Sequence, residues 1–126
     1  MTETRESVAA DELYNALLEY AEKGNASPRV RATLGGWSCR VHIEAVDVPE
    51  GRFTFVVTNG NSAPPSIGLD GVPDLIIRGH SMDLAEIFWG DANPVSNYMQ
   101  GAIQTQGRAD DVMRLDALAM FIFLNQ

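Results

Sequence analysis

Hydrophobic positions in the first third of the chain recur with the period of an α-helix. After a polar start of about nine residues, which we expect to be frayed, the segment Asp11–Lys23 places an apolar residue every three or four positions. The face consists of Leu13, Leu17 and Tyr20, with Ala16 and Ala21 beside it. Gly24-Asn25 is expected to end this helix. A short second helix is predicted from Ser27-Pro28 to about Leu34, since serine caps a helix and proline suits its first turn.

From Arg40 to Val46 the hydrophobic period becomes two, which predicts a β-strand. Its apolar face consists of Val41, Ile43 and Ala45, and the face expected to meet solvent consists of Arg40, His42 and Glu44. Val48-Pro49-Glu50-Gly51 then has the residues of a tight turn. A return strand, Arg52–Thr58, places Phe53, Phe55 and Val57 on one side. The resulting hairpin needs helices over its apolar face.

Residues 59–73 are rich in Gly, Pro, Asn and Ser, and at most Ser66–Leu69 is expected to form a brief strand. Asp74–Arg78 then predicts a short apolar strand. A helix is predicted from Met82 to Trp89, with Ser81 as its cap. Gly90 is expected to end that helix in the left-handed conformation.

The rest of the chain predicts two more helices and a strand between them. Asn93-Pro94 is typical of a helix start, and Gly101 is expected to stop that helix. Ala102–Gln106 predicts a strand followed by Gly107. The last helix, Asp110–Leu124, has one stripe formed by Val112, Leu115, Ala119 and Ile122. Met113, Ala117, Met120, Phe121 and Leu124 widen that stripe until little polar surface remains. Such a helix needs cover from the core, a second subunit or a bound apolar ligand.

The order of motifs from Leu75 to Gly107 resembles the sterol carrier protein-2 family. The residues that carry the resemblance are Asp83-Leu84 in the helix, Gly90-Asp91-Ala92-Asn93-Pro94 after it, and the glycines Gly101 and Gly107 around the strand. The resemblance implies an α+β fold. This would be a two-layer sandwich in which helices cover one face of a mainly antiparallel sheet of about five strands. It also implies an apolar tunnel between the layers that binds fatty acids, acyl-CoA, sterols or other lipids. The family's fuller third strand has no clear counterpart in residues 59–73.

Composition narrows the possible partners. The 126 residues suit one domain, and we expect no second domain or linker. Nine basic and 17 acidic residues give a formal charge of −8, so nucleic acid is not an expected partner. The longest apolar run, Ala117–Leu124, is too short to span a bilayer. A single cysteine and the polar N-terminus favour a cytoplasmic location.

The leading hypothesis is the binding or transfer of a hydrophobic small molecule, with no metal or other cofactor. The apolar faces predict the ligand contacts, which are Val41, Phe53, Phe55, Leu84, Phe88, Tyr98, Met99, Met113, Ala117 and Phe121. Candidate partners for a polar head group are Tyr98, Gln104 and Arg78. These residue types suit a pocket that is mostly apolar with a few polar groups.

Two alternatives remain open. The first is a small enzyme that moves a proton on a hydrophobic intermediate, with His80, Asp83 or Glu86 as the acid or base. Cys39 and His42 do not suit a nucleophile–base pair, because residues three apart on a strand point to opposite faces. The second alternative is a protein-interaction module that forms a homodimer through the C-terminal helix.

Overall fold

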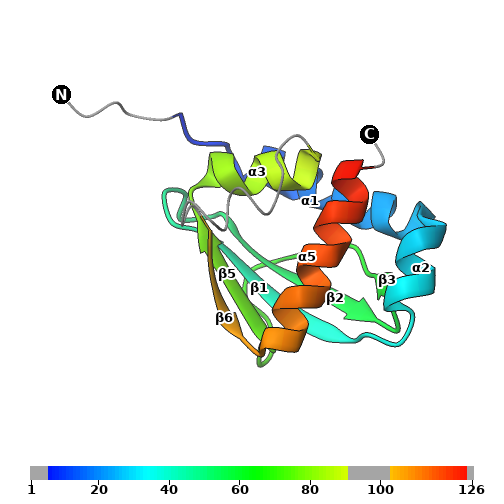
Figure 1. Ribbon diagram of the computed structural model, residues 1–126. Helices are drawn as coiled ribbons and strands as arrows, with labels where there is room; N and C mark the ends of the chain where they lie inside the picture. The colour runs from blue at the N-terminus through cyan, green and yellow to red at the C-terminus, as the bar shows by residue number, and fades with distance from the viewer. Residues whose placement is uncertain (1–5, 91–102, 125–126) are drawn as a thin grey trace.

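Two strands of the predicted hairpin lie at the centre of a sheet that helices cover on one side (Figure 1). The computed structural model describes residues 6–90 and 103–124. Its helices are α1 (Ala10–Ala26), α2 (Pro28–Leu34), α3 (Ser81–Trp89) and α5 (Ala109–Leu124). Its strands are β1 (Cys39–Ala45), β2 (Arg52–Thr58), β3 (Asn61–Ser62), β4 (Ser66–Ile67), β5 (Leu75–Gly79) and β6 (Ile103–Gly107). The α+β class inferred from the sequence is confirmed.

The sheet is mixed, with the strand order β3-β2-β1-β5-β6, and β4 pairs with the same strand as β3. β1 and β2 are antiparallel, with Val41 opposite Phe55. β5 runs parallel to β1, and β6 returns antiparallel to β5. The brief strand expected near Ser66 is therefore present. A further two-residue strand, β3, adds to the same edge.

Helix α1 continues past the point where Gly24 was expected to end it. Gly24 is buried inside the helix, and a Cβ atom there would lie 3.1 Å from Cδ1 of Leu118 on α5. The missing side chain lets the two helices approach closely, so this glycine serves helix packing. The predicted start of α2 is confirmed, since the Ser27 side chain accepts the backbone N–H of Val30 at 3.3 Å.

The cap of α3 is His80, and the prediction of Ser81 is wrong. Nδ1 of His80 accepts the backbone N–H of Met82 at 3.2 Å. The Ser81 hydroxyl is turned away, because it donates to Asp47 at 2.7 Å and accepts the N–H of Val8 at 2.7 Å. Gly90 ends the helix with φ 81°, as predicted.

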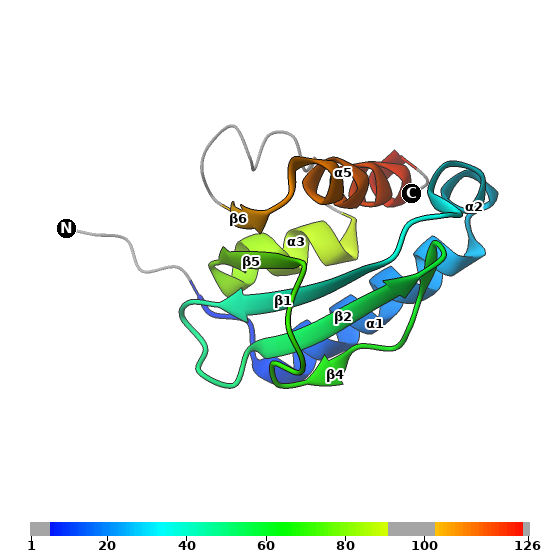
Figure 2. The same cartoon turned by 90° about the horizontal axis from the view of Figure 1, so that it is seen from below.

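The outer face of the sheet is less exposed than its polar residues suggest. Residues 63–73, which we call the outer loop, cross in front of β1 and β2 in Figure 2. His42 was expected to meet solvent but is only 7% exposed, and its Nε2 lies 2.9 Å from the carbonyl oxygen of Asp70. The outer loop covers this part of the polar face of β1, so His42 is buried although it lies on the side of the strand that was expected to meet solvent.

Several predictions concern residues outside the described ranges. They are the helix at Asn93-Pro94, its end at Gly101, and the positions of Tyr98 and Met99.

Candidate ligand-binding cavity

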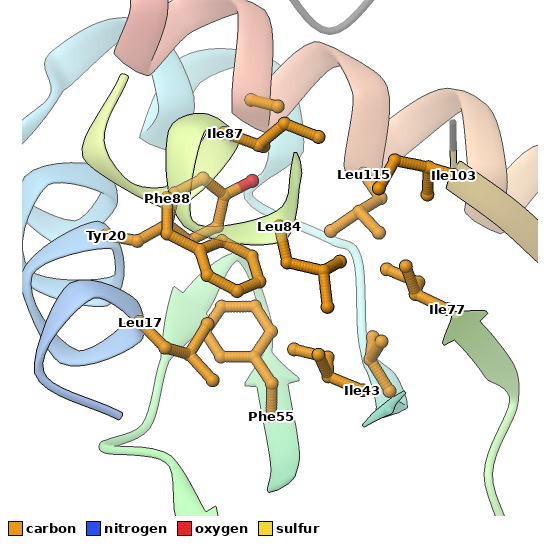
Figure 3. Close-up of a pocket in the computed structure, with 12 residues that line it drawn as sticks. Leu17, Tyr20, Ile43, Phe55, Ile77, Leu84, Ile87, Phe88, Ile103 and Leu115 are labelled. Carbon is orange, nitrogen blue, oxygen red and sulfur yellow. The ribbon is translucent and has the colours of Figure 1, made fainter. Parts of the chain in front are cut away.

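A small apolar cavity lies between the sheet and the helices (Figure 3). On the helix side, its lining residues come from α1, α3 and α5, and on the sheet side they come from β1, β2, β5 and β6. They are Leu17, Tyr20, Val41, Ile43, Phe55, Ile77, Leu84, Ile87, Phe88, Ile103, Leu115 and Ala119. Alternation along the strands points one set of side chains toward the cavity, and one face of each helix supplies the other set. The site is therefore built by the same pattern that builds the core.

Aromatic rings form one wall of the cavity. The Tyr20 ring meets Phe88 at 5.3 Å and Phe55 at 5.9 Å between centroids, both in edge-to-face geometry. The Tyr20 hydroxyl is the only polar side-chain group among the described lining residues. The wall thus joins α1, α3 and β2 through contacts that suit an apolar ligand or a packed core.

The cavity volume is about 30 Å³. Pockets for small molecules usually measure roughly 300–1,000 Å³. A lipid would therefore fit only if the helices or side chains moved outward. The space between the described lining residues is therefore close to that of a filled core.

Four of the predicted ligand contacts line this cavity: Val41, Phe55, Leu84 and Phe88. Phe53 is buried beside it but packs against Tyr14, with 6.0 Å between ring centroids.

The predicted contacts on α5 lie elsewhere. Met113 is 67% exposed, and Ala117 and Phe121 are half-buried outside the cavity lining. The face of α5 that reaches the cavity carries Leu115 and Ala119, which belong to the other stripe seen in the sequence. A helix that is apolar all round gives no periodic signal for which stripe faces inward.

The remaining lining residues carried visible sequence signals. Leu17 and Tyr20 belong to the apolar face of the first predicted helix, and Ile43 belongs to the inward face of the first strand. Ile77 and Ile103 were placed in predicted strands that were not assigned to the site. The sequence does not show that these residues, which lie on different helices and strands, line the same cavity.

The two head-group candidates that the structure describes face away from the cavity. Arg78 is exposed on the outer face of the sheet, where its Nε donates to Glu44 at 3.1 Å. Gln104 is paired with Arg78 in the sheet register and is also exposed.

The structure places the three acid–base candidates outside the cavity lining. His80 is committed to the cap of α3 and lies 3.3 Å from Oδ2 of Asp47. Asp83 is buried and Glu86 half-buried on α3, and neither lines the cavity.

Cys39 is a poor nucleophile in this structure. Burial raises the pKa of its thiol to about 12, and the carboxylates of Asp111 and Asp74 add to the rise. The thiol therefore stays protonated at neutral pH. Cys39 and His42 also point to opposite faces of the sheet, as predicted. Cys39 belongs to the core, whereas His42 bonds to the outer loop.

The two layers and the cavity between them define the class of fold, an α+β sandwich with helices on one face of a mixed sheet. Solved structures identify it as the sterol carrier protein 2 fold. The sterol carrier protein domain 2 of Helicoverpa armigera aligns with a TM-score of 0.65 over 98% of this chain and 94% of its own, at 18% identity.

Two further structures show the same similarity. A crystal structure of sterol carrier protein 2 has a TM-score of 0.63, with 15% identity over 86% of this chain and 94% of its own. Palmitated SCP2L2 from Aedes aegypti has a TM-score of 0.59, with 16% identity over 89% and 95%. No protein-family model and no curated protein matches the sequence. At these identities the likeness establishes the fold.

The described residues contain neither a membrane-spanning helix nor a cluster of metal-binding side chains. Within residues 6–90 and 103–124, no helix combines the length and apolar character needed to cross a bilayer. The same residues bring together no group of three or more His, Cys, Asp or Glu side chains that could hold a metal ion.

Proposed function

We propose that this protein binds a hydrophobic small molecule, such as a fatty acid, between its sheet and helices, and transfers it. The observation that carries the proposal is the cavity, whose described lining is apolar except for one tyrosine hydroxyl. Burial of an apolar chain there would stabilise the complex by roughly 25 cal/mol for each Å² removed from water. The fold adds support, because one structure of the same fold is described as palmitated.

Ligand binding on this proposal requires the cavity to expand. The sheet side is held by strand pairing of β1 with both β2 and β5. On the helix side, the apolar side chains of Leu84, Ile87 and Leu115 line the cavity, and their contacts can change without breaking backbone hydrogen bonds. We therefore expect α3 and α5 to separate when a lipid enters, while the sheet stays unchanged.

Two alanines on α5 give a sharp test. Ala119 lines the cavity, whereas Ala117 on the same helix lies outside its lining. Binding of a fluorescent fatty acid would be measured by titration for the wild type, Ala119→Leu and Ala117→Leu. The larger side chain at Ala119 fills the cavity, so we expect weaker binding there and nearly unchanged binding for Ala117→Leu.

The outcome separates the two stripes of α5. Equal losses in both variants would contradict the cavity as the site, and a loss confined to Ala117→Leu would favour the stripe that contains Met113 and Phe121. A wild-type protein that carries no lipid in native mass spectrometry and binds no fatty acid would overturn the function itself.

A homodimer through α5 is the second candidate. It is favoured by the exposure of Met113, at 67%, and of Leu124, at 60%, on this helix. Sedimentation at micromolar concentration checks it. A strict monomer, or a dimer that Met113→Glu leaves intact, would contradict an interface on α5.

A further inference from the structure

His80 is the single residue between β5 and α3, and both nitrogens of its ring have partners. Nδ1 accepts the backbone N–H of Met82 at 3.2 Å, which caps α3. Nε2 lies 3.3 Å from Oδ2 of Asp47, in the turn after β1. A ring nitrogen that accepts a hydrogen bond carries no proton, so the neutral ring has its proton on Nε2 and directs it toward Asp47. The described geometry is therefore that of a neutral His80.

A second proton on His80 would remove one of these contacts and strengthen the other. A protonated ring has a hydrogen on both nitrogens, so Nδ1 can no longer accept the Met82 N–H. The positive charge would also lie at the N-terminus of α3, where the helix dipole disfavours cations. The contact of Nε2 with the Asp47 carboxylate gains charge attraction instead. Proton uptake thus removes the cap of α3 but keeps the ring at the turn.

Ser81 keeps the start of α3 in place in both states of His80. Its backbone N–H and its hydroxyl donate to the two carboxylate oxygens of Asp47, each at 2.7 Å. Burial raises the pKa of Asp47, but hydrogen bonds from Ser7 and Ser81 outweigh this effect and lower the pKa to about 2. Asp47 therefore stays ionised between about pH 5 and 8, where imidazole groups usually gain or lose a proton. Ser81 can serve as a fixed point while the rest of the first turn loosens.

The charged groups of the elements next to His80 are mostly acidic. They are Asp47 and Glu50 in the turn after β1, Asp83 in the first turn of α3, Glu6 before α1, Asp11 and Glu12 in the first turn of α1, and Arg78 on β5. Asp47 lies within ion-pair distance of His80, whereas Arg78 bonds to Glu44. Asp47 is thus the charged partner that the described contacts give to His80.

We propose that His80 acts as a proton-controlled latch on α3, which holds the helix over the cavity while the ring is neutral and lets it pivot about Ser81 once the ring is protonated. The inference rests on the proposed function, because α3 carries Leu84, Ile87 and Phe88 of the cavity wall and has to move when a lipid enters or leaves. Exchange of the bound molecule should therefore be faster at about pH 5 than at about pH 8.

Stopped-flow fluorescence tests the latch by following the release of a pyrene-labelled fatty alcohol from the full chain between about pH 5 and pH 8. This probe has no group that titrates in that range. We expect the release rate to rise about threefold to tenfold from the high to the low pH, which is the effect of losing one cap. His80→Asn keeps a capping side chain that does not titrate, so its release rate should vary less than about twofold.

His42→Gln is the matched control. It removes the other histidine of the chain, which lies under the outer loop on the face of the sheet opposite the helices, and it should keep the wild-type profile. Circular dichroism at both ends of the pH range checks that each variant folds. A flat wild-type profile, a rise that persists in His80→Asn, or a rise lost equally in His42→Gln would overturn the latch.

Two further measurements separate the possible failures. In an NMR titration of the ligand-free wild type, the backbone amide of Met82 should shift as His80 gains its proton, and an amide that does not respond would overturn the latch without recourse to any variant. Equilibrium binding of the fatty alcohol at about pH 8 reports the proposed function. Binding there with a pH-independent release rate overturns the latch alone, whereas no binding of fatty alcohol or fatty acid overturns the proposed function and the latch together.

Discussion

Both carboxylate oxygens of Asp47 accept hydrogen bonds from Ser81, one from its backbone N–H and one from its hydroxyl, each at 2.7 Å. This relationship joins the turn after β1 to the first residue of α3. The Ser81 hydroxyl in turn accepts the N–H of Val8, so three segments far apart in the sequence meet at Ser81. The start of α3, which carries part of the cavity wall, is fixed by this junction.

Asp47 should make stability depend on pH in the acid range. Burial raises the pKa of its carboxyl, but hydrogen bonds from Ser7 and Ser81 outweigh this effect and lower the pKa from 3.8 to about 2. A depressed pKa in the folded state gives stability that is present above about pH 4 and is lost as the pH falls through about 2. Solvent screening reduces the effect, and we expect about 1 kcal/mol.

The measurement is the free energy of unfolding in urea at several pH values between about 2 and 5. Asp47→Asn should flatten the dependence in this window. Asp70→Asn is the control, because the Asp70 side chain is 82% exposed. An unchanged slope in Asp47→Asn, or equal flattening in the control, would show that the junction contributes no such stability.

His80 should behave as a helix cap. Replacing it with alanine removes the acceptor for the Met82 N–H, and a lost cap typically costs about 1 kcal/mol. Asparagine also caps helices, so His80→Asn should retain most of the stability. Thermal unfolding of the two variants provides the comparison. If both lose stability equally, the cap is not the reason that histidine matters, and the contact of its Nε2 with Asp47 at 3.3 Å becomes the explanation.

Local signals in the sequence predicted much of the fold. The alternation of Val41 and Ile43 gave the correct inward face of β1, and the backbone N–H of Gly51 bonds to Val48 at 2.9 Å in the expected turn. The choice of stripe on α5 failed because its apolar pattern has no distinct polar side. The bonds of Asp47 to Ser81 were not predictable, since nothing local to either residue indicates the other.

The dipeptide Asn59-Gly60 is a local signal for a hairpin turn. Asn59-Gly60 connects β2 to β3 through two residues, both with positive φ, at 50° and 79°. This is the sequence and backbone geometry of a type I′ hairpin turn. Residues 59–73 were instead interpreted by their overall Gly, Pro and Ser content, which hid the specific turn.

Gly60 should tolerate no side chain. Its positive φ strains any other residue, and a Cβ atom would collide with the carbonyl oxygen of Leu34. We expect Gly60→Ala to lower the free energy of unfolding by roughly 2 kcal/mol or more. Gly36→Ala is the control, because no atom lies within 4 Å of a Cβ there. Urea unfolding compares the two, and a Gly60→Ala loss no greater than the control's would contradict the proposed strain.

Leu84 allows the cavity to be enlarged. It is 1% exposed and lines the site, so Leu84→Ala should destabilise the protein by about 2–5 kcal/mol and leave more space between the layers. If that space accepts a fatty acid, ligand should restore part of the lost stability. The rise in melting temperature on adding saturating fatty acid should then be larger in Leu84→Ala than in the wild type.

Leu118→Ala provides the matched control for this change. Leu118 is 2% exposed and lies in the core, but it is outside the described cavity lining. Its loss should destabilise the protein to a similar degree without making room for ligand at the site. Equal ligand-induced shifts in the two variants would mean that destabilisation alone explains the response. A larger shift only in Leu84→Ala would show that space at this cavity limits ligand binding.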